Sequence, residues 1–190
     1  PVMILKIFDW YFTFKGWKIE GKGIPPHVNK CVIIALPHTS NWDFVYAMAA
    51  IRLFGIKMNY LAKKELFTWP IKKIFTNTGG IPVERSKNNQ MVELITRKFN
   101  EADKLFLAIP VEGTRKRVEK IKTGFYHVAK SAGVPVCMAY LDYSTKTAGF
   151  SEPFYPTGDP IADAAGIRDF YRNKTGKYPE NFNLDSIKLD

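Results

Sequence analysis

The strongest constraint on the fold is a regular alternation of short apolar runs with longer amphipathic segments. The apolar runs predict buried strands, because they are continuous and rich in β-branched residues. They span residues 31–36, 58–62, 104–111 and 134–143. Segments with helical periodicity cover 40–54, 64–77, 88–103 and 122–132. The alternation predicts a three-layer α/β fold, in which helices flank a mixed, mostly parallel central sheet.

The length of 190 residues is enough for one domain with a sizeable core. The sequence contains neither an internal repeat nor a Gly/Ser linker. We therefore predict a single domain over 1–190. Its motif-bearing core spans 31–143, and a tail in which Pro, Gly and Asp become frequent spans 150–190.

The charge of the chain is strongly positive and unevenly distributed. The net charge is +10, and residues 57–130 contain 16 lysines and arginines but only seven acidic residues. Such a field suggests an anionic partner, namely a phosphorylated substrate, a nucleic acid or an acidic membrane surface. A well-solvated basic surface without a partner is the simpler alternative, and charge alone does not distinguish them.

The first 15 residues predict a helix whose surface is apolar except for one narrow stripe. Lys6, Asp9 and Thr13 form that stripe, since they recur at spacings of three and four. The segment is too short to span a bilayer. It can lie in a membrane interface, with Trp10 and Tyr11 at the level of the headgroups, or it can pack on the domain. The sequence leaves both alternatives open.

A histidine and an aspartate stand where the first predicted strand gives way to a helix. In one interpretation, Ser40 caps the helix and Asp43 completes a capping box, so that His38 is only a loop residue. In the other, the loop brings the His38 imidazole to the Asp43 carboxylate in the first helical turn. Asp43 would then fix the tautomer and stabilise the imidazolium, which leaves the second ring nitrogen free as a general base. One His and one Asp are too few ligands for a metal site.

Two further polar clusters follow predicted strands. Gly80 opens a short strand that ends at Arg85, whose planar guanidinium suits a phosphate. The sequence Glu-Gly-Thr-Arg at 112–115 leaves another strand and offers a hydroxyl, a guanidinium and backbone N–H groups to an anion. Ligands of parallel α/β sheets bind beyond the carboxyl ends of the strands. We therefore expect both clusters to converge with His38 on one cleft.

Taken together, these motifs resemble those of the glycerolipid acyltransferases, the H-x4-D family that includes 1-acylglycerol-3-phosphate acyltransferases. Four family motifs occur in order. They are H-x4-D at 38–43, a glycine-to-arginine stretch at 80–85, E-G-T-R at 112–115 and Val-Pro at 134–135. One position departs from the family pattern, because Val111 stands where a proline usually precedes the E-G-T-R glutamate.

The resemblance implies a glycerol-phosphate-acyltransferase-like fold and an acyl transfer in phospholipid biosynthesis. The donor would be acyl-CoA or acyl-carrier protein, and the acceptor the hydroxyl of a lysophospholipid, with 1-acyl-sn-glycerol-3-phosphate as the first choice. His38 would act as the base, and Asp43 would orient it. The residues expected to bind substrate are Ser40, Gly80, Arg85, Glu112, Gly113, Thr114 and Arg115. We expect no metal and no cofactor, since the acyl thioester is itself a substrate.

The resemblance also implies that the protein acts at a membrane surface, bound peripherally on the cytoplasmic face. It implies no nucleic-acid partner. Cys31 and Cys137 lie in apolar runs and predict buried free thiols, which fits a reducing compartment. Two alternatives stay open. One is an acyl thioesterase or esterase of the same fold, in which water replaces the acceptor. The other is a basic nucleic-acid-binding module, which leaves the His38–Asp43 pair without a role.

Overall fold

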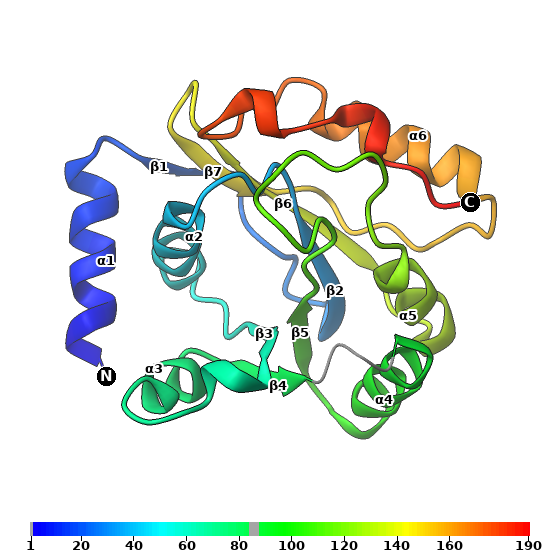
Figure 1. Cartoon of the computed structure of the whole chain (residues 1–190), viewed down its shortest axis with the longest axis horizontal. Helices are drawn as coiled ribbons and strands as arrows, with labels where there is room; N and C mark the ends of the chain where they lie inside the picture. Colours follow the sequence, from blue (N-terminus) through cyan, green and yellow to red (C-terminus); the bar gives the residue numbers. More distant parts are fainter. Residues whose placement is uncertain (1, 84–87) are drawn as a thin grey trace.

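The computed structural model describes residues 2–83 and 88–190, and in this part of the chain one seven-stranded sheet is flanked by helices (Figure 1). The strands are β1 (Lys18–Glu20), β2 (Lys30–Ala35), β3 (Asn59–Lys63), β4 (Gly80–Val83), β5 (Leu105–Ala108), β6 (Val136–Asp142) and β7 (Thr147–Phe150). The helices are α1 (Val2–Phe14), α2 (Trp42–Leu53), α3 (Lys72–Asn77), α4 (Asn88–Glu101), α5 (Gly124–Ala132) and α6 (Pro160–Tyr171). Short 3₁₀ turns lie at 64–66, 179–181 and 184–186.

The strand order is β1-β7-β6-β2-β5-β3-β4, and every neighbouring pair is parallel except β6 with β7. The predicted mostly parallel α/β sheet is therefore confirmed. Strand β7 was not predicted from the sequence, because its four residues, Thr-Ala-Gly-Phe, are too few to show a pattern. The predicted strand over 104–111 is wrong in length. Its pairing ends at Ala108, two residues before Pro110, which has no N–H to donate to a neighbouring strand.

Strand β2 runs through the centre of the sheet and is covered on both faces. Its side chains alternate between two core clusters. Val32 and Ile34 pack with residues of α4, α5 and α6, whereas Cys31 and Ile33 pack on the opposite face with Phe106 of β5 and the segments 24–28 and 56–58. Burial on both faces explains why the sequence of β2 is a continuous apolar run.

The topology places the carboxyl ends of β2, β5 and β6 at one edge of the sheet, because the three strands are neighbours and parallel. The loops that follow these strands begin with Leu36, Ile109 and Tyr143. Polar residues on the three loops therefore meet beside one another, as expected for a ligand site in a parallel sheet.

Helix α1 packs on α2, so the packing alternative for the first 15 residues is correct for one face of this helix. Phe12 is fully buried there, and Asp9 pairs with Arg52 of α2 at 3.1 Å. The opposite face is apolar and faces solvent. Ile7, Trp10 and Phe14 are 53%, 62% and 67% exposed. In the described part of the chain, the helices are all too short or too polar to traverse a bilayer.

Candidate active site

The structure brings His38 and Asp43 into direct contact. Nδ1 of the imidazole lies 3.0 Å from Oδ2 of the carboxylate. His38 lies in the loop after β2, and Asp43 lies in the first turn of α2. The short loop between them folds back and brings the two side chains together. The carboxylate is buried, with Asp43 only 4% exposed, whereas the His38 side chain is 35% exposed. A buried carboxylate thus holds a histidine that solvent can reach.

The same carboxylate also holds the loop that leads into α2. Asp43 Oδ2 accepts hydrogen bonds of 2.9 Å from the backbone N–H groups of Thr39 and Ser40. The Ser40 hydroxyl in turn accepts a bond of 3.2 Å from the N–H of Trp42. The N-cap of α2 is Asn41, whose side chain makes no capping bond, so the prediction that Ser40 occupies the cap is wrong by one residue. The bond from the Ser40 N–H to Asp43 is nevertheless present beside the contact with His38, so the two interpretations do not exclude each other. Ser40 is buried, and its contact with a substrate stays a prediction.

Tyr143 is a third member of the site, and the sequence analysis missed it. Its hydroxyl donates a hydrogen bond of 2.6 Å to Asp43 Oδ1. Burial and this bond to an anion raise the pKa of Tyr143 well above its ordinary value, so the hydroxyl stays protonated and acts as a donor. The signal that could have identified Tyr143 is its position directly after β6, at the same edge of the sheet as His38.

Glu112 joins the loop after β5 to the His38 loop. The backbone N–H of His38 donates a hydrogen bond of 2.8 Å to Glu112 Oε2. Glu112 is buried, and this burial raises its pKa to about 7 although the bond from His38 acts in the opposite direction. The predicted convergence of His38 and Glu112 is thereby confirmed, and Glu112 fixes the backbone that carries the histidine.

The rest of the E-G-T-R loop is more open. Gly113 has a φ of +69°, which suits glycine, and a Cβ there would lie 3.0 Å from Lys122 Nζ. The Thr114 hydroxyl accepts a bond of 3.3 Å from the N–H of Lys116. Arg115 is exposed and makes no hydrogen bond or ion pair with any described residue. Its guanidinium is therefore available to a ligand.

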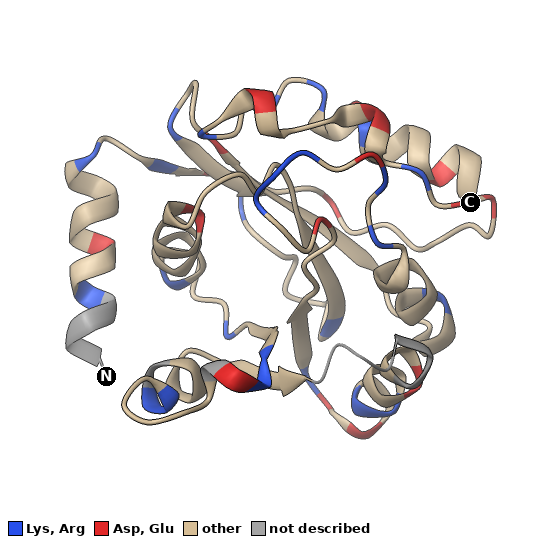
Figure 2. Cartoon of the chain, viewed as in Figure 1, with Lys and Arg blue, Asp and Glu red and all other residues tan. Residues whose placement is uncertain are grey.

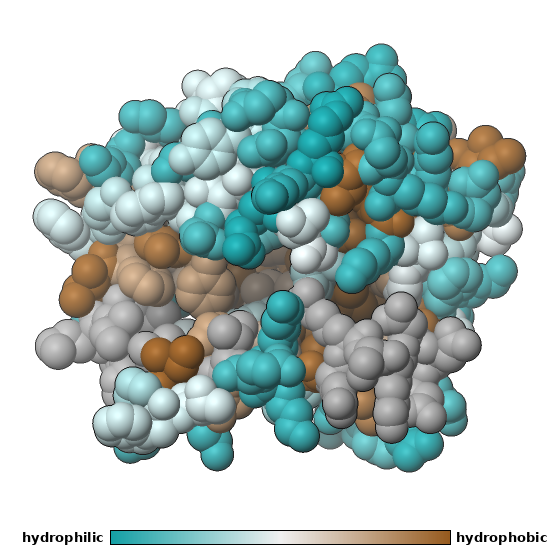
Figure 3. Space-filling model, in the orientation of Figure 1, coloured by the Kyte–Doolittle hydropathy of each residue, from teal (hydrophilic) through white to brown (hydrophobic). Residues whose placement is uncertain are grey.

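The region around this loop is strongly basic. Figure 2 shows lysines and arginines along the segment between β5 and α5, and the same segment forms part of the hydrophilic band across the upper middle of Figure 3.

Val111, which stands where a proline was expected, is buried in the main core, and its carbonyl accepts a hydrogen bond of 2.7 Å from the N–H of Lys122. Burial of Val111 and this hydrogen bond therefore anchor the start of the E-G-T-R loop, although the residue departs from the expected pattern.

Of the remaining predicted cluster, the structure describes Gly80, which lies on the edge strand β4. Gly80 pairs with Tyr60 at the beginning of β4, and a Cβ on Gly80 would lie 2.8 Å from the carbonyl oxygen of Phe75. Glycine is therefore needed there for the close approach of α3 to β4. No contact among the described residues joins Gly80 to His38. Arg85 lies outside the described residues, and its predicted role stays a prediction.

The chain near the C-terminus covers the His38 loop, which the sequence analysis did not anticipate. We call residues 175–178 the tail segment. The N–H of Tyr143 donates to the carbonyl of Thr175 at 2.9 Å, and the N–H of Tyr178 donates to the Thr39 hydroxyl at 3.1 Å. Gly176 lies so close to Thr39 that a Cβ would come within 2.8 Å of its hydroxyl oxygen. The tail segment thus holds the loop that carries His38.

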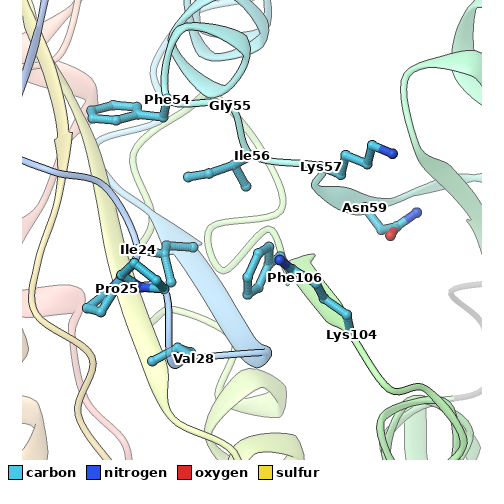
Figure 4. Close-up of a pocket in the computed structure, with 11 residues that line it drawn as sticks. Ile24, Pro25, Val28, Phe54, Gly55, Ile56, Lys57, Asn59, Lys104 and Phe106 are labelled. Atoms are coloured by element: carbon cyan, nitrogen blue, oxygen red, sulfur yellow. The ribbon is translucent and has the colours of Figure 1, made fainter.

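A cavity of about 600 Å³ lies away from this site. It opens between the C-terminal end of α2 and the beginnings of β3 and β5, with Phe54, Ile56 and Phe106 around it and Lys57 and Lys104 at one side (Figure 4). These residues belong to the amino ends of the parallel strands, opposite to the edge that carries His38. The cavity is therefore not the site of the His38–Asp43 pair.

Comparisons with known proteins agree with the fold and show the family. The crystal structure of the 1-acyl-sn-glycerophosphate (LPA) acyltransferase PlsC from Thermotoga maritima is similar, with a TM-score of 0.55 and 18% sequence identity. The match covers 92% of this chain and 82% of that chain. No curated protein matches the sequence. The model of the Acyltransferase family matches residues 18–141, more than half of the chain and all of the described site except the tail segment and Tyr143. The protein belongs to the acyltransferase family, as its ordered motifs predict.

Proposed function

We propose that the protein transfers a fatty acyl group from acyl-CoA or acyl-carrier protein to the free hydroxyl of a lysophospholipid. 1-Acyl-sn-glycerol-3-phosphate is the first candidate acceptor. The observation that carries the proposal is the His38–Asp43 contact in a member of the acyltransferase family. Asp43 engages Nδ1, whereas no described residue hydrogen-bonds Nε2, which leaves that atom for a substrate. The similarity to an LPA acyltransferase supports the choice of acceptor.

In the proposed reaction, Nε2 of His38 takes the proton of the acceptor hydroxyl as its oxygen attacks the carbonyl carbon of the thioester. A carbon–oxygen bond forms, and a tetrahedral intermediate results. Collapse of this intermediate breaks the carbon–sulfur bond, and the leaving thiolate receives the proton from Nε2. Asp43 holds the imidazole in the required tautomer and stabilises the transient imidazolium. General base catalysis of this kind contributes a factor of roughly 10² to 10⁴.

The phosphate of the acceptor would bind to Arg115 and Arg85, together with the backbone N–H groups of Gly113 and Thr114. Arg115 supports this assignment because it is exposed and unpaired among the described residues. A planar guanidinium can bind a phosphate with two parallel hydrogen bonds. Glu112 would act on the base rather than on the phosphate, because its carboxyl group holds the backbone of His38. Neither a metal nor a cofactor is needed for these steps.

The outer face of α1 would bind a membrane surface, where a lysophospholipid resides. Ile7, Trp10 and Phe14 follow one another at spacings of three and four, and Trp10 stacks on Phe14 with ring centroids 5.1 Å apart. Aromatic and aliphatic side chains on one helical face insert at the headgroup–acyl boundary. The two cysteines are free and buried, which suits the reducing side of that membrane. We therefore place the protein on the cytoplasmic face, peripherally bound.

The test is an acyl-transfer assay with palmitoyl-CoA and lysophosphatidic acid that follows both thiol release and the product lipid. We expect release that depends on the acceptor, and its loss in His38→Ala. His127→Ala, which removes an exposed histidine on α5, is the matched control and should keep full activity. Palmitoyl-carrier protein and other lysophospholipids extend the assay if CoA is not accepted.

Two results would overturn the proposal. Thiol release without an acceptor would make the protein a thioesterase of the same fold. Absence of turnover with every thioester donor and lysophospholipid would leave the His38–Asp43 pair with only a structural role in the loop before α2.

A further inference from the structure

Among the residues that the structure describes, Tyr143 is the one partner of the Asp43 carboxylate that comes from outside the His38 loop and α2. Asp43 Oδ2 receives three donors, namely the His38 ring and the backbone N–H groups of Thr39 and Ser40. Among the described residues, Oδ1 receives only the Tyr143 hydroxyl, at 2.6 Å. Without that hydroxyl, one oxygen of a buried carboxylate would have no protein donor, which is unfavourable for a charged group.

The Tyr143 ring is itself firmly held. It lies edge-on to Trp17, with centroids 4.8 Å apart, and edge-on to Tyr46 of α2 at 5.8 Å. Its backbone N–H donates to Thr175 of the tail segment. Aromatic packing holds the ring, and the bond to Thr175 holds the backbone of the same residue. The hydroxyl is therefore presented in one direction, toward Asp43.

We propose that Tyr143 is a positioning residue for the reaction, whose hydroxyl keeps the Asp43 carboxylate oriented toward His38. The effect on turnover rests on the proposed function, whereas the effect on the histidine rests on the contacts alone. The hydroxyl anchors the carboxylate at Oδ1. Removing it frees the carboxylate to rotate and therefore weakens the hydrogen bond between Oδ2 and Nδ1 of His38.

Titratable groups near the pair include Glu112 on the loop after β5, Tyr46 on α2 and Tyr178 on the tail segment. Tyr11 of α1 stacks on Tyr46, and Lys177 lies over the Tyr178 ring. Tyr46 offers the matched control, because it belongs to the same aromatic cluster and touches the Tyr143 ring but makes no hydrogen bond to Asp43. Tyr46→Phe and Tyr143→Phe each remove one hydroxyl and keep the ring.

The experiment follows the ring N–H signals of the purified full chain by NMR. The chain has three histidines, so His38→Ala identifies the signal of His38 among those of His27 and His127. In Tyr143→Phe we expect the Nδ1–H signal of His38, which reports the hydrogen bond to Asp43, to move upfield or to broaden through faster exchange with water. We expect kcat to fall about tenfold, as for loss of one hydrogen bond to a charged group, with both KM values within about twofold. In Tyr46→Phe the Nδ1–H signal and kcat should stay as in the wild type.

A second comparison separates positioning from a general loss of structure. In an Asp43→Asn background, Tyr143→Phe should change the ring signals of His38 no further, because the partner of the hydroxyl is already changed. An unchanged Nδ1–H signal of His38 in Tyr143→Phe would overturn the proposal, even if kcat fell. A changed signal in a protein that shows no acyl transfer would support the Tyr143–Asp43–His38 coupling and overturn the proposed function instead.

Discussion

The backbone N–H of His38 and the buried carboxyl group of Glu112 are joined by a hydrogen bond of 2.8 Å. The bond links the loop after β2 to the loop after β5, and so fixes the backbone from which the imidazole projects. Both the neutral and the ionised carboxyl group can accept this bond through an oxygen lone pair. Ionisation in the buried site is nevertheless unfavourable, which is why the pKa of Glu112 is raised to about 7.

Glu112 is therefore expected to make the stability of the protein depend on pH. Its pKa rises from 4.5 to about 7 on folding, so the folded protein binds more protons between these values. The free energy of unfolding should fall as the pH rises through this window, by about 3 kcal/mol in total, and then level off. Glu112→Gln keeps the acceptor oxygen and removes the charge, so its unfolding free energy should lose this part of the pH dependence.

Urea unfolding at several pH values between 4.5 and 8.5 measures the effect. Glu119→Gln, an exposed residue of the same loop, is the control and should keep the wild-type slope. Parallel curves for the wild type and Glu112→Gln would show that Glu112 ionises freely in the folded protein.

The tail segment is expected to be sensitive to a single methyl group at Gly176. A Cβ there would lie 2.8 Å from the Thr39 hydroxyl oxygen and 3.1 Å from Pro37 Cβ, so Gly176→Ala must push the segment off the His38 loop. We expect a loss of stability of about 1–3 kcal/mol, as for other overpacked sites, together with a drop in kcat. Thermal unfolding and the acyl-transfer assay measure the two effects.

Gly166 provides the contrast for this prediction. It lies inside α6, and a Cβ there meets no atom within 4 Å. Gly166→Ala should therefore raise stability by about 0.5–1 kcal/mol, because alanine has the higher helix propensity, and should leave kcat unchanged. Equal behaviour of the two variants would mean that the tail segment does not restrain the loop.

The outer face of α1 is expected to determine membrane binding. Trp10→Ser combined with Phe14→Ser removes two exposed aromatic rings without touching Phe12, which packs on the domain. We expect weaker sedimentation with vesicles of phosphatidylglycerol and phosphatidylethanolamine, and little change in unfolding temperature. Ile161→Ser removes an equally exposed apolar side chain on α6 and should sediment like the wild type. Unchanged sedimentation of the double variant would assign the binding to another surface.

Much of this fold is visible in the sequence because its elements are long enough to show a period. The run at 31–36 predicts β2, and the Ser40–Asp43 pattern predicts the start of α2. Asp159 followed by a proline is a strong helix start, and the Asp159 side chain does accept bonds from the first N–H groups of α6. Strand β7 escapes prediction because its four residues are too few to show a period, and its place between β1 and β6 depends on long-range pairing.

The site is less predictable, because half of its contacts join residues far apart in the chain. His38 and Asp43 are five positions apart, so local geometry is sufficient to propose their contact. Tyr143 lies 100 positions from Asp43, and Tyr178 lies 139 from Thr39, and no local pattern predicts either bond. Glu112 was expected to bind substrate, and the structure adds that its carboxyl group accepts a bond from the backbone of His38.

Arg115 is expected to recognise the phosphate of the acceptor, since its guanidinium is exposed and unpaired among the described residues. Arg115→Ala should raise KM for lysophosphatidic acid about tenfold or more, the effect of a lost charged hydrogen bond, and leave kcat nearly unchanged. Arg115→Lys keeps the charge but not the planar pair of donors, so its KM should be intermediate. Arg97→Ala on α4, also an exposed arginine, serves as the control. Initial rates with each substrate varied in turn give both constants. A selective rise in KM for palmitoyl-CoA would instead place Arg115 beside the phosphates of the donor.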